Sequence, residues 1–337
     1  MRMGWRGALG LVLSAALLTY TLRDVDFGHV WNVLRTSNLW LFLLSAATAT
    51  ALFPIRAWRW RYILEPVAPK LPLGVLFRAT AVGMMINNTV PARAGEVARA
   101  YAVSREASGV GFGAAVASLA IDRICDAVVI VLILLAAMAA PGFPGAATLA
   151  GQPVSRVIGG VTAIAIVLLL ALGAVAAYPT RALRLFDRAI RPISPVLADR
   201  GGTLLSSFAK GLGALRSPRL VALVFFWTVV HWLVGCLSFY VAFRAVGIAA
   251  PFSAAMFLQS VIALGVAAPS SPGFFGVFEF FAREGLALYG VSQNDAVSWA
   301  LGYHILAFIP ITVIGAWYFT RLGMHLRDIG RAAPGGA

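Results

Sequence analysis

The sequence is short of charge. Only 12% of its 337 residues are charged, against about 25% in a typical soluble domain. Hydrophobic residues make up 60% of the chain, and they fall in runs of about 16 to 25 residues, long enough to span a bilayer. The lack of charge excludes an ordinary soluble protein. The long apolar runs predict an all-α polytopic membrane protein.

Cysteine, lysine and acidic residues are also scarce. The two cysteines both lie in apolar segments, which excludes a disulfide framework. With 13 acidic against 27 basic residues, the chain has a formal net charge of +14. Proteins that bind nucleic acid gather such charge on a solvated domain, and no soluble stretch here is long enough to form one. We therefore expect no nucleic-acid partner.

Six segments are predicted to cross the membrane. They lie near 5–22, 38–57, 112–140, 155–177, 219–243 and 296–319, and the first is expected to be an uncleaved helix. Most arginines, including Arg56 and Arg59, then fall in loops on one face, which the positive-inside rule makes cytoplasmic. Trp58, Trp60 and Trp232, near the ends of spans, are expected to be interfacial anchors. We expect a multi-pass protein of the bacterial plasma (inner) membrane with both termini in the cytoplasm.

Two further apolar segments, 73–90 and 252–267, each run into a break rich in proline and glycine. Non-helical backbone at membrane depth is tolerated only where it is buried in protein or lines a wet cavity. Both segments are therefore predicted to be re-entrant or broken helices, and the span count rises to seven or eight if either crosses fully. The residues expected to hold the breaks are Pro91, Gly95, Pro269, Pro272, Gly273 and Gly276.

The same order of segments occurs in the two halves of the chain, 1–140 and 155–320. Each half runs span, interfacial segment, span, broken segment, span. Because each half has three crossings, the second enters the membrane upside down, the pattern of the inverted-topology repeats of many secondary transporters. The chain, 1–337, is predicted to be a single integral membrane domain, with a basic amphipathic segment at 180–216 on the cytoplasmic leaflet.

Three clusters of charge lie beside or inside apolar segments, where an ionisable residue costs about 3 kcal/mol and points to function. The clusters are Arg93, Glu96 and Arg99; Asp122, Arg123 and Asp126; and Glu279 followed by Arg283. One interpretation is structural: Glu96 pairs with an arginine, Asp126 with Arg123, and Glu279 with Arg283. The other is a site for an anion, because a helix that begins after a break offers free N–H groups and arginine matches phosphate.

Together with Arg56-Ala-Trp-Arg-Trp60, these clusters resemble the lysylphosphatidylglycerol synthase transmembrane-region family of flippase-like membrane proteins. The motifs are Pro91-Ala-Arg-Ala-Gly-Glu-Val-Ala-Arg99, Asp122-Arg-x-x-Asp126 and Pro269-x-x-Pro-Gly-x-x-Gly-x-x-Glu279. Two positions depart from the family pattern, which usually has Glu at Asp122 and a second glycine at Phe274. The resemblance implies a role in lipid translocation or lipid modification. Since the sequence ends at Ala337, we expect the soluble aminoacyl-transfer domain of the bifunctional relatives to be absent.

The residues and the resemblance together predict a lipid transporter that binds an anionic, phosphate-bearing phospholipid or polyprenyl lipid. Arg93, Arg99 and Arg123 are predicted to bind the phosphate, while Glu96, Asp122, Asp126 and Glu279 orient them or exchange protons. We expect no catalytic residue, no cofactor and no metal, and we interpret His231 and His304 as core or pore-lining residues. Two alternatives stay open, a membrane-embedded lipid-modifying transferase with Glu96 or Asp122 as general base, and a non-transporting subunit of an envelope lipid-biogenesis complex. The expected partners are anionic membrane lipids, with a homo-oligomer or an envelope-biogenesis protein as further options.

Overall fold

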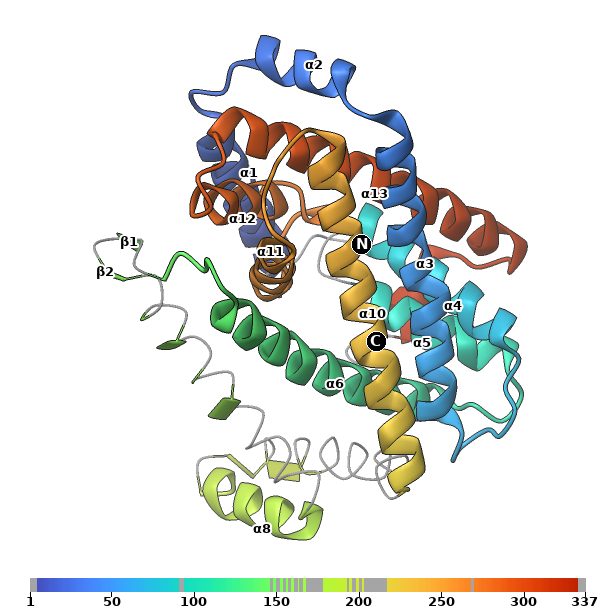
Figure 1. Cartoon of the computed structure of the whole chain (residues 1–337). Helices are drawn as coiled ribbons and strands as arrows, with labels where there is room; N and C mark the ends of the chain where they lie inside the picture. The colour runs from blue at the N-terminus through green and yellow to red at the C-terminus, as the bar shows by residue number, and fades with distance from the viewer. Residues whose placement is uncertain are drawn as a thin grey trace.

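The computed structural model describes residues 5–90, 94–145, 178–192, 217–267 and 270–332, with short stretches between 148 and 202. Its helices are α1 (Trp5–Leu22), α2 (Phe27–Thr36), α3 (Leu39–Leu64), α4 (Leu73–Thr89), α5 (Gly95–Glu106), α6 (Phe112–Ala139), α8 (Pro179–Ile190), α10 (Pro218–Ala245), α11 (Phe252–Gly265), α12 (Val277–Ala287), α13 (Gln293–Arg321) and α14 (Leu326–Ala332), with the short 3-10 helix η2 (Pro272–Phe274). Two short strands, β1 (Thr148–Leu149) and β2 (Gln152–Pro153), pair with each other. The predicted all-α class is confirmed (Figure 1).

Three of the described helices, α3, α10 and α13, are long and apolar enough to cross a membrane. Residues 8–22 and α2 pass the same test together but are bent by 85°, so they form a broken span or a re-entrant loop. α6 has 28 residues, and its apolar sequence is interrupted by three charged side chains. The segment predicted to span at 155–177 lies largely outside the described residues.

The predicted second span is longer than expected and carries its arginines inside the protein. α3 continues to Leu64, so Arg56 and Arg59 lie on the helix and not in a cytoplasmic loop. Arg59 is fully buried. The loop assignment of these two arginines is therefore wrong. With 26 residues α3 is about 39 Å long, which exceeds the roughly 30 Å of the hydrocarbon core.

Both segments predicted to be broken consist of two short helices separated by a break. α4 ends at Thr89 and α5 begins at Gly95, whereas α11 ends at Gly265 and α12 begins at Val277. Pro91, Arg93 and Pro269 lie outside the described residues. In the second break Gly273 and Gly276 have φ values of +66° and +88°, and Phe274 also has φ +66°. The family's usual glycine would adopt the Phe274 conformation without strain.

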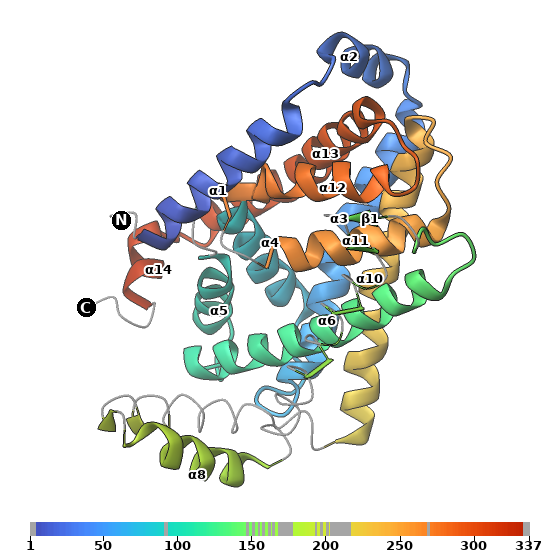
Figure 2. The same ribbon diagram turned by 90° about the vertical axis from the view of Figure 1, so that its left-hand side faces the viewer.

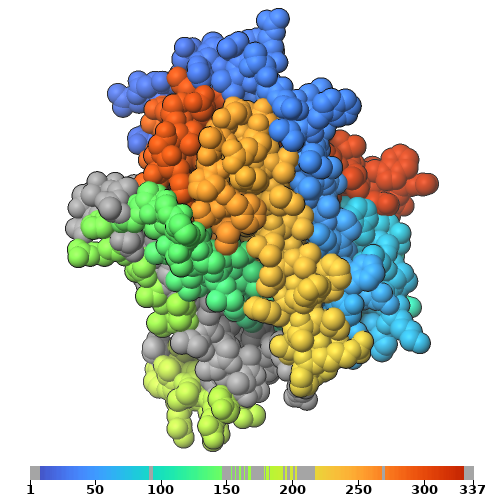
Figure 3. Space-filling view, viewed as in Figure 1, coloured from blue at the N-terminus to red at the C-terminus, as the bar shows by residue number. Residues whose placement is uncertain are grey.

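The same order of long and short helices occurs twice along the chain. The long helices α3 and α10 lie side by side in the centre, and α10 covers the middle of one face next to α3 and α6 (Figures 1 and 3). The series α3–α4–α5–α6 runs long, short, short, long, and α10–α11–α12–α13 repeats that order. α4 packs against α13, and its counterpart α11 packs against α6 (Figure 2). The inverted repeat remains a prediction, which superposition of the two series tests directly.

Backbones approach closely where α4 meets α5. A Cβ on Gly95 would collide with the carbonyl oxygen of Gly83 and with the side chain of Asn87. We expect Gly95→Ala to push the helices apart and to lower the free energy of unfolding by about 1–3 kcal/mol, the usual cost of overpacking. A thermal melt in detergent measures this loss. The control is Gly113→Ala on α6, where the new methyl group meets open space and helix propensity favours alanine; equal melting of the two variants would contradict the prediction.

Candidate functional site

A buried network of arginines and carboxylates joins α3, α5 and α6. Its centre is Arg59 of α3, which is 0% exposed. Arg59 Nη2 lies 2.5 Å from Asp122 Oδ1, and Arg59 Nη1 lies 2.6 Å from Asp126 Oδ1. The two aspartates are four residues apart on α6, so they share one helix face. One guanidinium fork therefore bridges both carboxylates.

Three more arginines converge on the same aspartates. Arg99 Nη1 of α5 lies 2.9 Å from Asp122 Oδ2. Asp126 Oδ2 lies 3.5 Å from Arg56 Nη2 and 3.3 Å from Arg123 Nη1. Each aspartate thus has at least two cationic partners, which offset the cost of burying an ionised carboxylate.

Polar and aromatic groups complete the network. Arg123 Nη2 reaches Glu96 Oε1 at 2.6 Å, and these two side chains are its exposed edge. Arg59 also donates to Thr228 Oγ1 of α10 at 3.2 Å, and Trp232 Nε1 donates to Asp126 Oδ1 at 2.9 Å. Because these bonds tie α10 to α3 and α6, the network links the two central helices to the first break.

Two tryptophans expected at the membrane interface are instead buried beside this network. The guanidinium carbon of Arg99 lies 4.0 Å from the Trp60 ring centroid, a cation–π contact. Trp60 donates its indole N–H to Ser118 at 2.7 Å. Trp60 and Trp232 are 0% and 9% exposed, so their assignment as interfacial anchors is wrong. Their position at the ends of apolar runs did not predict their polar partners on α6.

Charge and hydrogen bonds in this network do not balance. Four arginines face three carboxylates, which leaves one positive charge in excess among the described residues. Arg56 Nε and both Arg99 Nε and Nη2 are buried with no hydrogen-bond partner. Leaving a buried donor unsatisfied costs about 1–3 kcal/mol. The imbalance therefore favours an acceptor with negative charge at this place.

The unpartnered donors line a small cavity between α3, α4 and α5. Its lining residues are Arg56, Thr80, Gly83, Met84, Asn87, Gly95, Glu96 and Arg99. The cavity has room for about 10 Å³, the size of one water molecule. Asn87 Oδ1 accepts a hydrogen bond from the Gly95 N–H at 2.9 Å and thereby caps the start of α5. The cavity as it stands is smaller than a phosphate group.

The third predicted cluster is a separate site. Glu279 of α12 is 0% exposed, and its Oε1 lies 2.5 Å from His304 Nδ1. The expected ion pair with Arg283 does not form: Arg283 Nη1 donates to the Tyr20 and Thr21 carbonyl oxygens of α1 at 2.8 and 3.0 Å. The carboxylate instead turns back to accept the Gly276 N–H at 2.6 Å, as glutamate in the first turn of a helix often does.

Sequence and structure agree on most of the first site. The structure brings Glu96, Arg99, Asp122, Arg123 and Asp126 together. The Asp126–Arg123 contact forms as predicted, and the arginine that pairs with Glu96, which the sequence did not specify, is Arg123. It adds two arginines of α3 that the sequence analysis had placed in a loop. The available signal was the sequence between Pro54 and Pro66, which contains no helix-breaking residue and carries those arginines three residues apart, about one helical turn.

The sequence matches the family described as the lysylphosphatidylglycerol synthase TM region over residues 7–315. The chain belongs to this family. The match and the apolar helices together make it a multi-pass membrane protein. The buried network, with its arginines and aspartates on α3, α5 and α6, thus lies in the membrane region that gives this family its name.

Two curated relatives share much of the chain. A UPF0104 membrane protein of Methanothermobacter thermautotrophicus is 27% identical over 323 residues, which cover 92% of this chain and 90% of the relative. The glycosyltransferase AglD of Haloferax volcanii is 26% identical over 329 residues, which cover 91% of this chain and 52% of the relative. The chain thus spans about half the length of AglD. The family match and the UPF0104 relative agree that the chain is a membrane protein.

Proposed function

We propose that this family member moves a phosphate-bearing lipid between the leaflets of the plasma membrane, with both of its termini in the cytoplasm. The observation that carries the proposal is the buried excess of positive charge, with unpartnered donors on Arg56 and Arg99. Phosphate oxygens satisfy such donors, and arginine binds them through paired hydrogen bonds. Neither nucleotide nor metal motifs accompany these arginines in the sequence, so phosphate recognition is assigned to the arginines themselves.

The cavity also constrains the headgroup. Glu96 Oε2 is buried without a partner in the same lining. A ligand that fits therefore accepts hydrogen bonds from the two arginines and donates one to Glu96. A phosphate ester that carries a proton, or a headgroup with a hydroxyl or amine next to its phosphate, has both properties.

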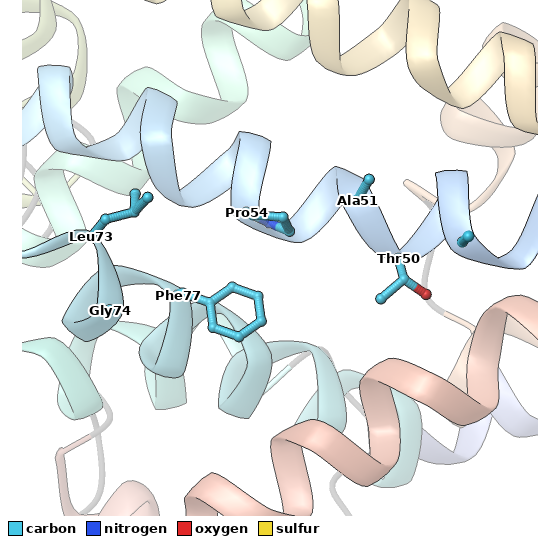
Figure 4. A pocket seen from close by; sticks show the side chains of 7 residues that line it. Thr50, Ala51, Pro54, Leu73, Gly74 and Phe77 are labelled. Carbon is cyan, nitrogen blue, oxygen red and sulfur yellow. The ribbon is translucent and has the colours of Figure 1, made fainter.

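An apolar groove on the same pair of helices supports a lipid rather than a soluble anion. The groove lies between α3 and α4 and has a volume of about 430 Å³. Phe77 of α4 faces Pro54 of α3 across it, and Thr50 projects into the space beside them (Figure 4). Its lining is almost entirely hydrocarbon, as an acyl or prenyl chain requires. Arg56, which lines the polar cavity, follows Pro54 by two residues.

Reconstitution into vesicles with a fluorescent phospholipid tests the proposal through Arg56→Gln. This change removes the excess charge but keeps the shorter ion pairs of Arg59, Arg99 and Arg123. A lost hydrogen bond to a charged group is worth about 1.5–3 kcal/mol, so we expect lipid movement to slow about 10- to 100-fold. Arg219→Gln, on an exposed side chain of α10, is the control. Wild-type movement no faster than in protein-free vesicles, or equal rates for both variants, would reject a phosphate-lipid transporter.

A transferase acting on a lipid is the second candidate, favoured by the name of the relative AglD. The geometry argues against Asp122 as its general base, because that carboxylate is held by Arg59 and Arg99 and a base has to accept a proton readily. Glu96, with one oxygen unpartnered, is the better candidate. Conversion of a lipid by the purified protein in detergent, followed by mass spectrometry, would support this candidate. Glu96→Gln should then abolish the conversion.

A further inference from the structure

A second buried polar site lies at the other break, apart from the arginine network. Glu279 of α12 and His304 of α13 are 0% and 7% exposed. The rings of Phe275 and Phe278 lie 4.4 and 4.5 Å from the His304 ring, between centroids. These contacts surround an ionisable pair of side chains with aromatic rings.

The hydrogen bonds of the pair fix how many protons it holds. His304 Nε2 lies 2.8 Å from the Gly273 carbonyl oxygen, which only accepts, so Nε2 carries a proton. His304 Nδ1 lies 2.5 Å from Glu279 Oε1, so a second proton lies between these two atoms. The pair is then either an imidazolium with a carboxylate or an imidazole with a carboxylic acid, and both forms are neutral overall. Loss of the shared proton would set a nitrogen lone pair against a carboxylate oxygen and leave one buried negative charge, which is unfavourable.

Other ionisable side chains on the elements packed against this pair have different contacts. On α12 Arg283 pairs with Glu284, and on α1 Tyr20 lies beside Arg283. On α13 Tyr303 is hydrogen-bonded to Ser238, and Asp295 pairs with His29 of α2. On α4 Arg78 pairs with Glu106, on α3 Arg56 and Arg59 belong to the network, and on α10 the ring of His231 lies against Trp232. α11 has no ionisable residue. Among the described residues, His304 is the only ionisable side chain that pairs with Glu279.

The shared proton holds three parts of the break together. Through His304 it fixes Gly273, whose φ of +66° places it at the turn of η2. Through Glu279 it fixes the Gly276 N–H at the start of α12. η2 packs against α4, and α4 lines the polar cavity with Thr80, Gly83 and Asn87. α4 therefore contacts the η2 turn of the proton site and also lines the polar cavity.

We propose that Glu279 and His304 form a proton-binding site that exchanges its shared proton with water when the second break opens. With the proton bound, the break is closed onto α12 and α13. When the proton leaves to water, the pair becomes negative, the contact between Nδ1 and Oε1 becomes repulsive, and the Gly273 turn is released. That this exchange accompanies lipid movement rests on the function proposed above.

Glu279→Gln imitates the proton-loaded state. A glutamine amide donates to His304 Nδ1, while its oxygen accepts the Gly276 N–H, so every contact of the pair is kept and we expect the variant to fold and melt like the wild type. The first measurement is infrared difference spectroscopy of the whole protein in detergent between about pH 3 and pH 9, a range that includes the ordinary pKa values of free glutamate and histidine side chains. We expect carboxyl and imidazole bands that titrate in the wild type and in Glu284→Gln, the matched control, and that are absent in Glu279→Gln. His304→Gln is the second variant and should lose the imidazole bands.

The second measurement is the pH dependence of lipid movement in vesicles. We expect the wild-type rate to change by up to about tenfold per pH unit on the limiting side of its pH profile, the slope that a single required proton gives, and the Glu279→Gln rate to be flat. If no band of the wild type titrates, the pair keeps its proton permanently and the proposal is overturned. If the bands titrate but the wild type moves no lipid, the proton site stands and the proposed function fails. If lipid movement has the same pH dependence in Glu279→Gln as in the wild type, the coupling is refuted.

Discussion

Arg59→Leu is expected to have the largest effect on stability of any single change in the chain. Arg59 bridges Asp122 and Asp126 at 2.5 and 2.6 Å in a fully buried position. Removing one partner of a buried ion pair costs about 3–5 kcal/mol, a large share of the roughly 5–15 kcal/mol that stabilises a typical protein. We expect little monodisperse protein after purification in detergent, and a strongly lowered melting temperature for what remains.

Two further variants separate charge from geometry at this position. Arg59→Lys keeps the charge, but a single ammonium group lacks the fork that reaches two carboxylates, so its melting temperature should fall between those of the wild type and Arg59→Leu. Arg61→Leu, two residues further along α3, changes a partly exposed side chain and should shift the free energy of unfolding by no more than about 0.5 kcal/mol. If Arg59→Leu and Arg61→Leu have the same melting temperature, the network does not hold these helices together.

The burial of Arg59 shows where topology rules stop being informative. The positive-inside rule reads an arginine beyond an apolar run as a loop charge. The partners of Arg59 are 63 and 67 residues away, on α6. No local pattern contains that pairing, because it forms only when α3 and α6 pack together. By contrast, the Arg123–Asp126 contact follows from helical spacing and was predictable.

The Glu279 site shows a different limit. Helical spacing favours Arg283 as its partner, four residues ahead on the same helix. The structure pairs Glu279 with His304, 25 residues away, and with the N–H of Gly276 at the start of its own helix. The local cap could be inferred from glutamate three residues after a glycine break. The histidine could not, because its approach depends on how α12 packs against α13.

More of the fold than of the site could be predicted from the sequence. Apolar runs gave the long helices α3, α10 and α13, and the proline- and glycine-rich stretches gave both breaks. These features are local, since hydrophobicity and helix-breaking residues act within one turn or one run. Helix ends were less accurate: the second span was expected to end at 57, and α3 continues to Leu64. The seven additional residues include Arg59, whereas Arg56 already lay within the predicted bounds, at the end of the span, and was assigned to the following loop.

Filling the apolar groove is expected to stop lipid movement while the protein stays folded. Thr50 projects into the groove between α3 and α4 (Figure 4), and Thr50→Trp would put an indole ring where a lipid chain has to lie. Exclusion of a chain by a rigid ring is steric, so we expect movement of a fluorescent phospholipid to fall to the rate of protein-free vesicles. The groove is open and the side chain only partly buried, so the melting temperature should stay close to that of the wild type.

The matched control is Leu132→Trp on α6, an exposed apolar position that does not line the groove. It adds the same ring to the same apolar surroundings and should leave lipid movement unchanged. This comparison also distinguishes the two parts of the proposed site. If Thr50→Trp and Arg56→Gln both slow transport, one molecule uses the groove for its chain and the arginines for its phosphate. If Arg56→Gln slows transport and Thr50→Trp does not, the chain stays in the bilayer and only the headgroup passes through the protein.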